Sequence, residues 1–186
     1  MDFLTARIAE CDERIEVGCR PFAQKLERLK ALPGVGDRGA EQILAEGGTE
    51  MSQFPSHRHI ASWTGICPGN HERAGKRNSG KTRKGNRWLR TLLVEGAWAA
   101  ARTKGSYFQA QFRQLAHRRG FKKAARAVGH SLLVVAYHIL RDNVEYHDLG
   151  ADPFDRLKHH RLASYHVRRL EQLGYQVNLQ AKLPAA

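Results

Sequence analysis

Residues 32–40 read Leu32-Pro33-Gly34-Val35-Gly36-Asp37-Arg38-Gly39-Ala40, and this short stretch decides the class of fold. Proline and glycine end a helix that precedes them, and Gly34 and Gly36 let the backbone turn tightly. An apolar helical pattern resumes over residues 37–46 and is closed by a pair of glycines. Two helices joined by a short glycine-containing turn predict a helix-hairpin-helix unit in an all-α protein.

The same turn is a candidate contact for a nucleic-acid backbone. Gly34 and Gly36 carry no Cβ, so the main chain at the turn could approach a phosphate closely. The N–H groups at the start of the second helix would then face the anion. Such a turn binds phosphates and reads no base sequence. The alternative is a plain corner between two helices that binds nothing.

N-terminal to the turn, residues 2–30 have the pattern of one long helix with a break at 18–21, where Gly18 and Pro21 stand. Its apolar positions form an irregular stripe: Leu4, Ile8, Ile15, Phe22, Leu26 and Leu29. Because the first part has too little apolar surface for a core of its own, it is interpreted as a coiled-coil arm that needs a partner. The alternative is a surface helix packed on its own domain.

C-terminal to the turn, the sequence predicts a basic loop and then a small helical bundle. Residues 65–85 are rich in glycine and lack apolar periodicity, which is typical of a loop. Helices are predicted over residues 87–103, 107–119, 122–142 and 161–173, and a short strand over residues 175–179.

The charge distribution indicates a polyanionic partner. The chain has a formal net charge of +13, and residues 73–141 alone hold 17 Lys and Arg residues against one acid, Glu95. A surface that only needs solvation usually mixes both signs, so nucleic acid is the expected partner. The apolar runs are too short to cross a bilayer, and the N-terminus has no signal-peptide core. Three cysteines without a Cys-x-x-Cys pair fit a reducing cytosol.

The densest positive run is residues 73–90, with eight Lys and Arg residues and no acid. Gly75–Thr82 formally fits a P-loop pattern, but no buried strand precedes it, so nucleotide hydrolysis is the least favoured enzyme class. The histidines lack cysteine partners at zinc spacing, so no metal site is predicted. The predicted DNA contacts of the run are Lys76, Arg77, Lys81, Arg83, Lys84, Arg87 and Arg90.

Several motifs occur in the order seen in one protein family. They are residues 32–40, 54–56, 63–70, 74–90, 97–103 and 148–155. Together they resemble the C-terminal half of transposases of the insertion-sequence one-ten family, from about residue 10 to the end of the chain.

The resemblance implies a composite enzyme. Full-length members join a RuvC-like domain, whose acidic residues bind divalent metal, to a coiled-coil arm and this C-terminal domain, which supplies a serine nucleophile. Members act as multimers and are guided by a structured RNA from the element. Since the chain begins at the arm, the expectation is a truncated copy that holds no cofactor itself, with Mg²⁺ required only together with the RuvC-like domain.

The family serine falls on Arg73 in this sequence, and a guanidinium cannot attack a phosphodiester. The nearest hydroxyl is Ser79, whose attack on phosphate the flanking cations would ease. Ser79 is therefore the candidate catalytic residue. The alternative is a loop hydroxyl that hydrogen-bonds to phosphate.

The sequence thus suggests three parts: a coiled-coil arm remnant (1–30), a helix-hairpin-helix transposase C-terminal domain (31–158) and a C-terminal helix and tail (159–186). The leading function is the DNA-binding C-terminal portion of an insertion-sequence transposase in DNA transposition and recombination, inactive by itself. The alternative is a non-catalytic module that binds DNA or the element's RNA and oligomerises. The expected partners are DNA, that RNA and a second copy through the N-terminal helix, in the cytoplasm with the nucleoid and without a membrane.

Overall fold

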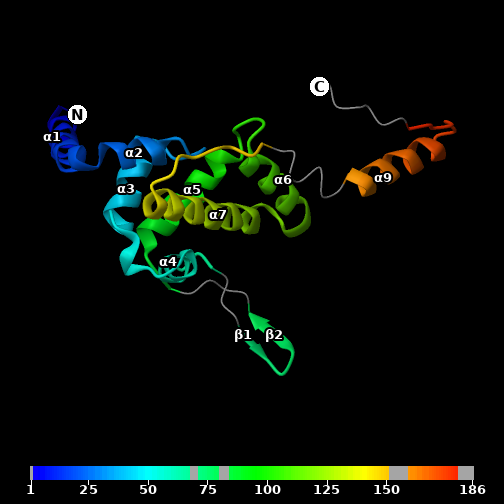
Figure 1. Ribbon diagram of the computed structural model, residues 1–186, viewed down its shortest axis with the longest axis horizontal. Helices are drawn as coiled ribbons and strands as arrows, with labels where there is room; N and C mark the ends of the chain where they lie inside the picture. The colour runs from blue at the N-terminus through cyan, green and yellow to red at the C-terminus, as the bar shows by residue number, and fades with distance from the viewer. Residues whose placement is uncertain (1, 68–70, 80–83, 151–158, 180–186) are drawn as a thin grey trace.

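The computed structural model describes residues 2–67, 71–79, 84–150 and 159–179, and these residues form a predominantly helical fold (Figure 1). The predicted all-α class is confirmed. The α-helices are α1 (Asp2–Cys19), α2 (Ala23–Lys30), α3 (Asp37–Gly47), α4 (His57–Thr64), α5 (Arg87–Ala100), α6 (Tyr107–Arg119), α7 (Phe121–Asp142) and α9 (His159–Gln172). Two 3-10 turns, η1 (Arg20–Phe22) and η2 (Met51–Gln53), and a two-stranded hairpin, β1 (His71–Arg73) and β2 (Lys76–Ser79), complete the described elements.

Helix α7 is the centre of the core. It packs against α5 and α6 and also against α2 and α4. Its buried stripe recurs at helical spacing, with Val128, Leu132 and Ala136 almost fully enclosed. The crossing with α5 is close because Gly129 lacks a side chain: a Cβ there would lie 2.8 Å from the carbonyl oxygen of Leu93.

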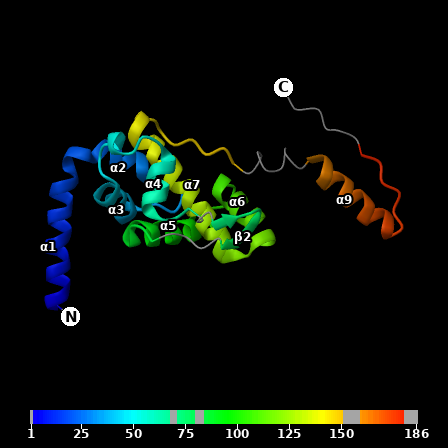
Figure 2. The same cartoon turned by 90° about the horizontal axis from the view of Figure 1, so that it is seen from below.

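The predicted break in the N-terminal helix is confirmed. α1 ends at Cys19, and Pro21 lies in the turn η1 before α2 begins. Leu26 and Leu29 of α2 are buried in the core, whereas α1 buries no residue. Figure 2 shows α1 projecting away from the other helices. The apolar side chains of α1 are therefore left in solvent within this single chain.

Local capping sets the ends of the central helices. Asn86 Oδ1 accepts a hydrogen bond from Leu89 N at 2.9 Å and so begins α5. Ser106 Oγ accepts one from Gln109 N at 3.1 Å and begins α6. Gly120, with a φ of +83°, is the single residue between α6 and α7, and glycine adopts this left-handed conformation without steric cost.

Two local predictions were wrong. The stretch predicted as a loop over residues 65–85 contains the β1–β2 hairpin, which turns at Ala74 and Gly75 with φ values of +51° and +74°. Positive φ at both turn residues matches the twist of a two-residue hairpin. Residues 175–179, predicted as a strand, have no regular structure. Strand pairing needs a partner segment, which a local pattern does not reveal.

Candidate nucleic-acid interface

The glycine turn between α2 and α3 packs onto α5. Gly34 has a φ of +82°, and a Cβ there would lie 2.1 Å from the carbonyl oxygen of Gly96 and 2.8 Å from Ala100 N. No side chain fits in that space. The sequence interpretation assigned the close approach at Gly34 to a phosphate, and this part needs correction: the approach is to the backbone of α5, inside the protein.

Gly36, by contrast, is open. It is the N-cap residue of α3 with φ −87° and ψ −171°, and no atom of the described residues lies within 4 Å of the place its Cβ would take. The charge beside it is mixed, however. Lys30 Nζ contacts Asp37 Oδ1 at 2.7 Å, and the hydrogen bond from Lys30 lowers the pKa of the Asp37 carboxyl. Because Asp37 already brings a negative charge to the start of α3, this helix end attracts a phosphate weakly.

The β1–β2 hairpin separates the two candidate nucleophile positions. Arg73 pairs with Lys76 at the turn, whereas Ser79 pairs with His71 at the far end, beyond a register shift between His71 and Glu72. The hairpin extends away from the helices (Figure 1). Arg73 and Ser79 therefore occupy opposite ends of the hairpin. Two of the predicted contacts, Lys81 and Arg83, lie outside the described residues.

The end of the basic run is fixed to α4. A Cβ on Gly85 would lie 2.5 Å from the backbone of Thr64, so this glycine permits a close contact between backbones. Asn86 N donates to the carbonyl oxygen of Trp63 at 3.3 Å, and Asn86 Nδ2 donates to Glu46 Oε2 at 2.5 Å. These contacts hold the first turn of α5 against α3 and α4.

Three of the predicted DNA contacts lie in or beside this part of the chain, whose position these hydrogen bonds fix. Lys84 and Arg87 are exposed just before and within the first turn of α5, and Arg90 is half-buried one turn later. Trp88 lies between them with its side chain also exposed. Lys84 and Arg87 thus lie three residues apart at the start of one helix, both exposed.

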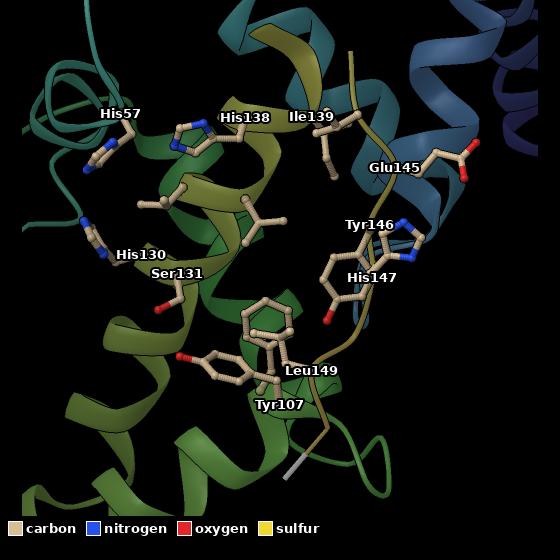
Figure 3. A pocket seen from close by; sticks show the side chains of 14 residues that line it. His57, Tyr107, His130, Ser131, His138, Ile139, Glu145, Tyr146, His147 and Leu149 are labelled. Atoms are coloured by element: carbon tan, nitrogen blue, oxygen red, sulfur yellow. The ribbon is translucent and has the colours of Figure 1, made fainter. Parts of the chain in front are cut away.

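A separate pocket of about 650 Å³ lies between α4, α7 and the segment 143–150 (Figure 3). The rings of His57 and His138 have centroids 5.7 Å apart, and His130 lies near His57 on the same side of the pocket. Burial, and to a lesser extent the nearby His57, lowers the pKa of His130. Among the described residues, no three His, Cys, Asp or Glu side chains are arranged to hold a metal ion.

Asp148 holds the segment 143–150, which forms one wall of this pocket, against α6 through hydrogen bonds. Its Oδ1 accepts hydrogen bonds from Tyr107 N at 2.8 Å and Gly150 N at 2.7 Å, and its Oδ2 accepts one from the Tyr146 hydroxyl at 2.9 Å. The Tyr146 ring stacks on Phe108 with centroids 6.1 Å apart. Burial and the Asp148 carboxylate raise the pKa of Tyr146. Sequence analysis missed this pocket because its walls come from segments far apart in the chain.

Comparison with known proteins shows which family the chain resembles. Residues 26–113, from α2 into α6, match the model of the transposase family IS116/IS110/IS902. Over this region the chain is similar to this transposase family. The resemblance drawn from the sequence motifs is thereby confirmed, and the matched residues include both the glycine turn and the basic run.

Individual transposases agree with the family match. Over 113 residues the chain is 34% identical to a probable family 20 transposase of Pseudomonas aeruginosa. This alignment covers 60% of the chain and 33% of that protein. It is 33% identical to the putative transposase y4pF/y4sB of Sinorhizobium fredii, over 64% of this chain and 32% of that protein. It is 29% identical to the transposase for insertion sequence element IS1111A of Coxiella burnetii, over 64% and 34%. The chain thus spans about a third of the length of the curated relatives it matches.

No helix in the described part of the chain is long and apolar enough to cross a membrane.

Proposed function

We propose that the chain is the DNA-binding portion of an insertion-sequence transposase and acts in DNA transposition, with residues 73–90 as its main contact to duplex DNA. The observation that carries this proposal is the exposed pair Lys84 and Arg87 at the start of α5, inside the family-matched region and inside a stretch with 17 basic residues and one acid. Cations that meet phosphates release counterions, and this supplies affinity without base readout.

Within this proposal the glycine turn has a minor part. Gly36 is open to solvent and can let a phosphate approach, while Gly34 serves the packing on α5. The β1–β2 hairpin would add Lys76 and Arg77 to the interface, since it continues the same basic run. Lys81, Arg83 and the half-buried Arg90 belong to the same proposed contact surface.

The arginine at position 73 favours a role in which the chain binds DNA without cutting it. Phosphoryl transfer needs an in-line nucleophile and a group that stabilises charge on the transferring oxygens. The resemblance puts the serine nucleophile at position 73, where this chain has arginine, and it puts the metal-binding acids and Mg²⁺ in a RuvC-like domain. We therefore expect the chain to bind DNA and the element's RNA without cutting DNA, unless Ser79 acts as the nucleophile in place of residue 73.

Pairing through α1 is the proposed mode of self-association. Leu4, Ile8, Cys11 and Ile15 follow one another at alternating spacings of four and three residues, as core positions of a two-stranded coiled coil do. Leu4 and Ile8 are exposed in the single chain. A second copy would cover this stripe and remove its apolar surface from water. The proposed division is then an arm over residues 1–30, a DNA-binding domain over 31–158 and a C-terminal helix and tail over 159–186.

The test is the salt dependence of duplex binding. Fluorescence anisotropy with a labelled duplex should show log affinity falling linearly with log salt, and Lys84→Gln with Arg87→Gln should reduce that slope by roughly 2. The matched control is Arg168→Gln with Arg169→Gln, two exposed cations of α9. A slope that is flat, or equally changed by both pairs, contradicts a contact at the start of α5.

A further inference from the structure

The corner between α6 and α7, here residues 113–126, is a second cationic surface. Its fourteen residues contain six Lys or Arg and no Asp or Glu. All six cations are exposed, and among the described residues no carboxylate forms an ion pair with any of them. They are Arg113, Arg118, Arg119, Lys122, Lys123 and Arg126. Mutual repulsion among them is left uncompensated in the chain itself, which calls for an anionic partner.

Two exposed aromatic rings meet at this corner. Phe121 is 64% exposed and Trp98 of α5 is 38% exposed. Their rings are 29° from parallel with centroids 6.5 Å apart, and the buried Phe112 lies 5.2 Å from Trp98 and 6.2 Å from Phe121. Phe112 thus supports the pair from below, while Trp98 and Phe121 present ring surface to solvent.

The platform is held on rigid elements. Gly120 alone separates the two helices: its N–H donates to Ala116 O at 2.9 Å, and its carbonyl accepts from Ala124 N at 3.0 Å. Ala124 and Ala125 are fully buried, so the first turns of α7 are fixed to the core. The rings therefore need little ordering when a ligand arrives, which lowers the entropic cost of binding.

We propose that the α6–α7 corner binds a single-stranded nucleic acid, with bases stacked on Phe121 and Trp98 and the phosphate backbone held by the six cations. Aromatic rings interleaved with positive charge are the means by which proteins bind single strands without sequence preference. A duplex satisfies the cations but keeps its bases stacked inside, out of reach of the rings. The surface is separate from the duplex contact proposed at residues 73–90 and adds a second class of ligand.

The experiment compares single-stranded and duplex oligonucleotides on the whole chain. Oligo-uridine and oligo-thymidine of about twelve nucleotides, a length in the range of known single-strand sites, are titrated against wild type, Phe121→Ser and the pair Lys122→Gln with Lys123→Gln. Loss of one stacking ring should weaken single-strand binding about 5- to 100-fold. Duplex binding by Phe121→Ser should stay at the wild-type value. Phe121 is mostly exposed, so its replacement leaves the fold intact, which circular dichroism checks.

Comparing the two oligomers tells whether the ligand is DNA or RNA. An equal loss with both supports binding through bases and phosphates common to DNA and RNA, whereas a larger loss with oligo-uridine supports RNA. The lysine pair should lower the single-strand salt slope by about 1.4. Photo-crosslinking with iodouracil-containing oligomers should label the peptide that carries Phe121 or Trp98. Single-strand affinity that is unchanged in Phe121→Ser, or crosslinks confined to residues 73–90, overturns the proposal without touching the duplex contact.

Discussion

Gly34 and Gly96 touch backbone to backbone: a Cβ on Gly34 would stand 2.1 Å from the carbonyl oxygen of Gly96. The contact joins the turn after α2 to the middle of α5, across some sixty residues of sequence. It explains why a residue that looks suited to hold a phosphate is needed for packing instead. The turn and α5 are packed tightly together, and the basic run lies in the sequence between Gly34 and Gly96.

Replacing Gly34 with alanine should destabilise the whole domain. The left-handed φ costs an alanine about 1–2 kcal/mol, and forced overlap adds about 1–3 kcal/mol. Urea unfolding should show the combined loss, whereas Gly36→Ala, in open space with an ordinary φ, should change stability by less than about 1 kcal/mol. Equal stability of the two variants would contradict the packing seen at Gly34.

Removing the Asp148 carboxylate should loosen the segment 143–150. Asp148→Ala loses the hydrogen bonds to Tyr107 N and Gly150 N, and a lost cap of this kind costs about 0.5–2 kcal/mol. Hydrogen exchange at residues 144–150 should become faster. Asp148→Asn keeps one acceptor oxygen and should show a smaller increase in exchange rate. Identical exchange rates in the wild type and both variants would show that the carboxylate does not hold the segment in place.

Stability should fall as the pH is lowered from about 7 to about 5, in part through His130. Its pKa is lowered in the folded state, so below its ordinary value of 6.5 the unfolded chain binds the proton more readily. Unfolding is then favoured by acid, by at most about 1.4 kcal/mol per pH unit. Asp142, whose pKa is lowered to about 2, stays ionised throughout this window. Urea unfolding of His130→Gln should show a weaker dependence of stability on pH. An unchanged dependence would count against a half-buried imidazole that stays neutral in the folded state.

Cys11 offers a direct test of pairing through α1. Its thiol is free and exposed, and it lies on the apolar stripe of the helix. In a parallel two-stranded coil the two copies of Cys11 face each other, so mild oxidation should yield a covalent dimer that Cys11→Ser abolishes. Ile8→Glu should also prevent the crosslink and shift the protein to monomer in analytical ultracentrifugation. A crosslink that survives Ile8→Glu would indicate random collision of exposed thiols.

Catalysis should depend on position 73. Supplied with a family RuvC-like domain and Mg²⁺, the unmodified chain should not join DNA strands, because Arg73 cannot act as a nucleophile. Arg73→Ser should gain strand-transfer activity under the same conditions, and Ser79→Ala should leave that gain intact. A covalent protein–DNA adduct formed by the unmodified chain and removed by Ser79→Ala would instead identify Ser79 as the nucleophile.

Local signals in the sequence were sufficient for most of the helices. Pro21 predicted the break between α1 and α2, and the apolar period over residues 122–142 predicted α7 to within one residue at its start. These features depend on backbone preferences and on the 3.6-residue repeat, both of which act over one or two turns. The family resemblance was also readable, since ordered motifs are a property of the sequence itself.

The helical class, the resemblance to one transposase family and the strong positive charge of the middle of the chain all follow from the order of the amino acids. Which residues touch became visible in the folded chain: Gly34 meets Gly96, Gly85 meets Thr64, Asp148 binds a distant segment to α6, and the rings of Trp98 and Phe121 lie together. The difference lies in the sequence distance over which each interaction acts. Helix propensity and charge are local or additive, whereas close contacts arise from the packing of distant segments around α7, and no periodicity encodes which backbone will face a missing Cβ.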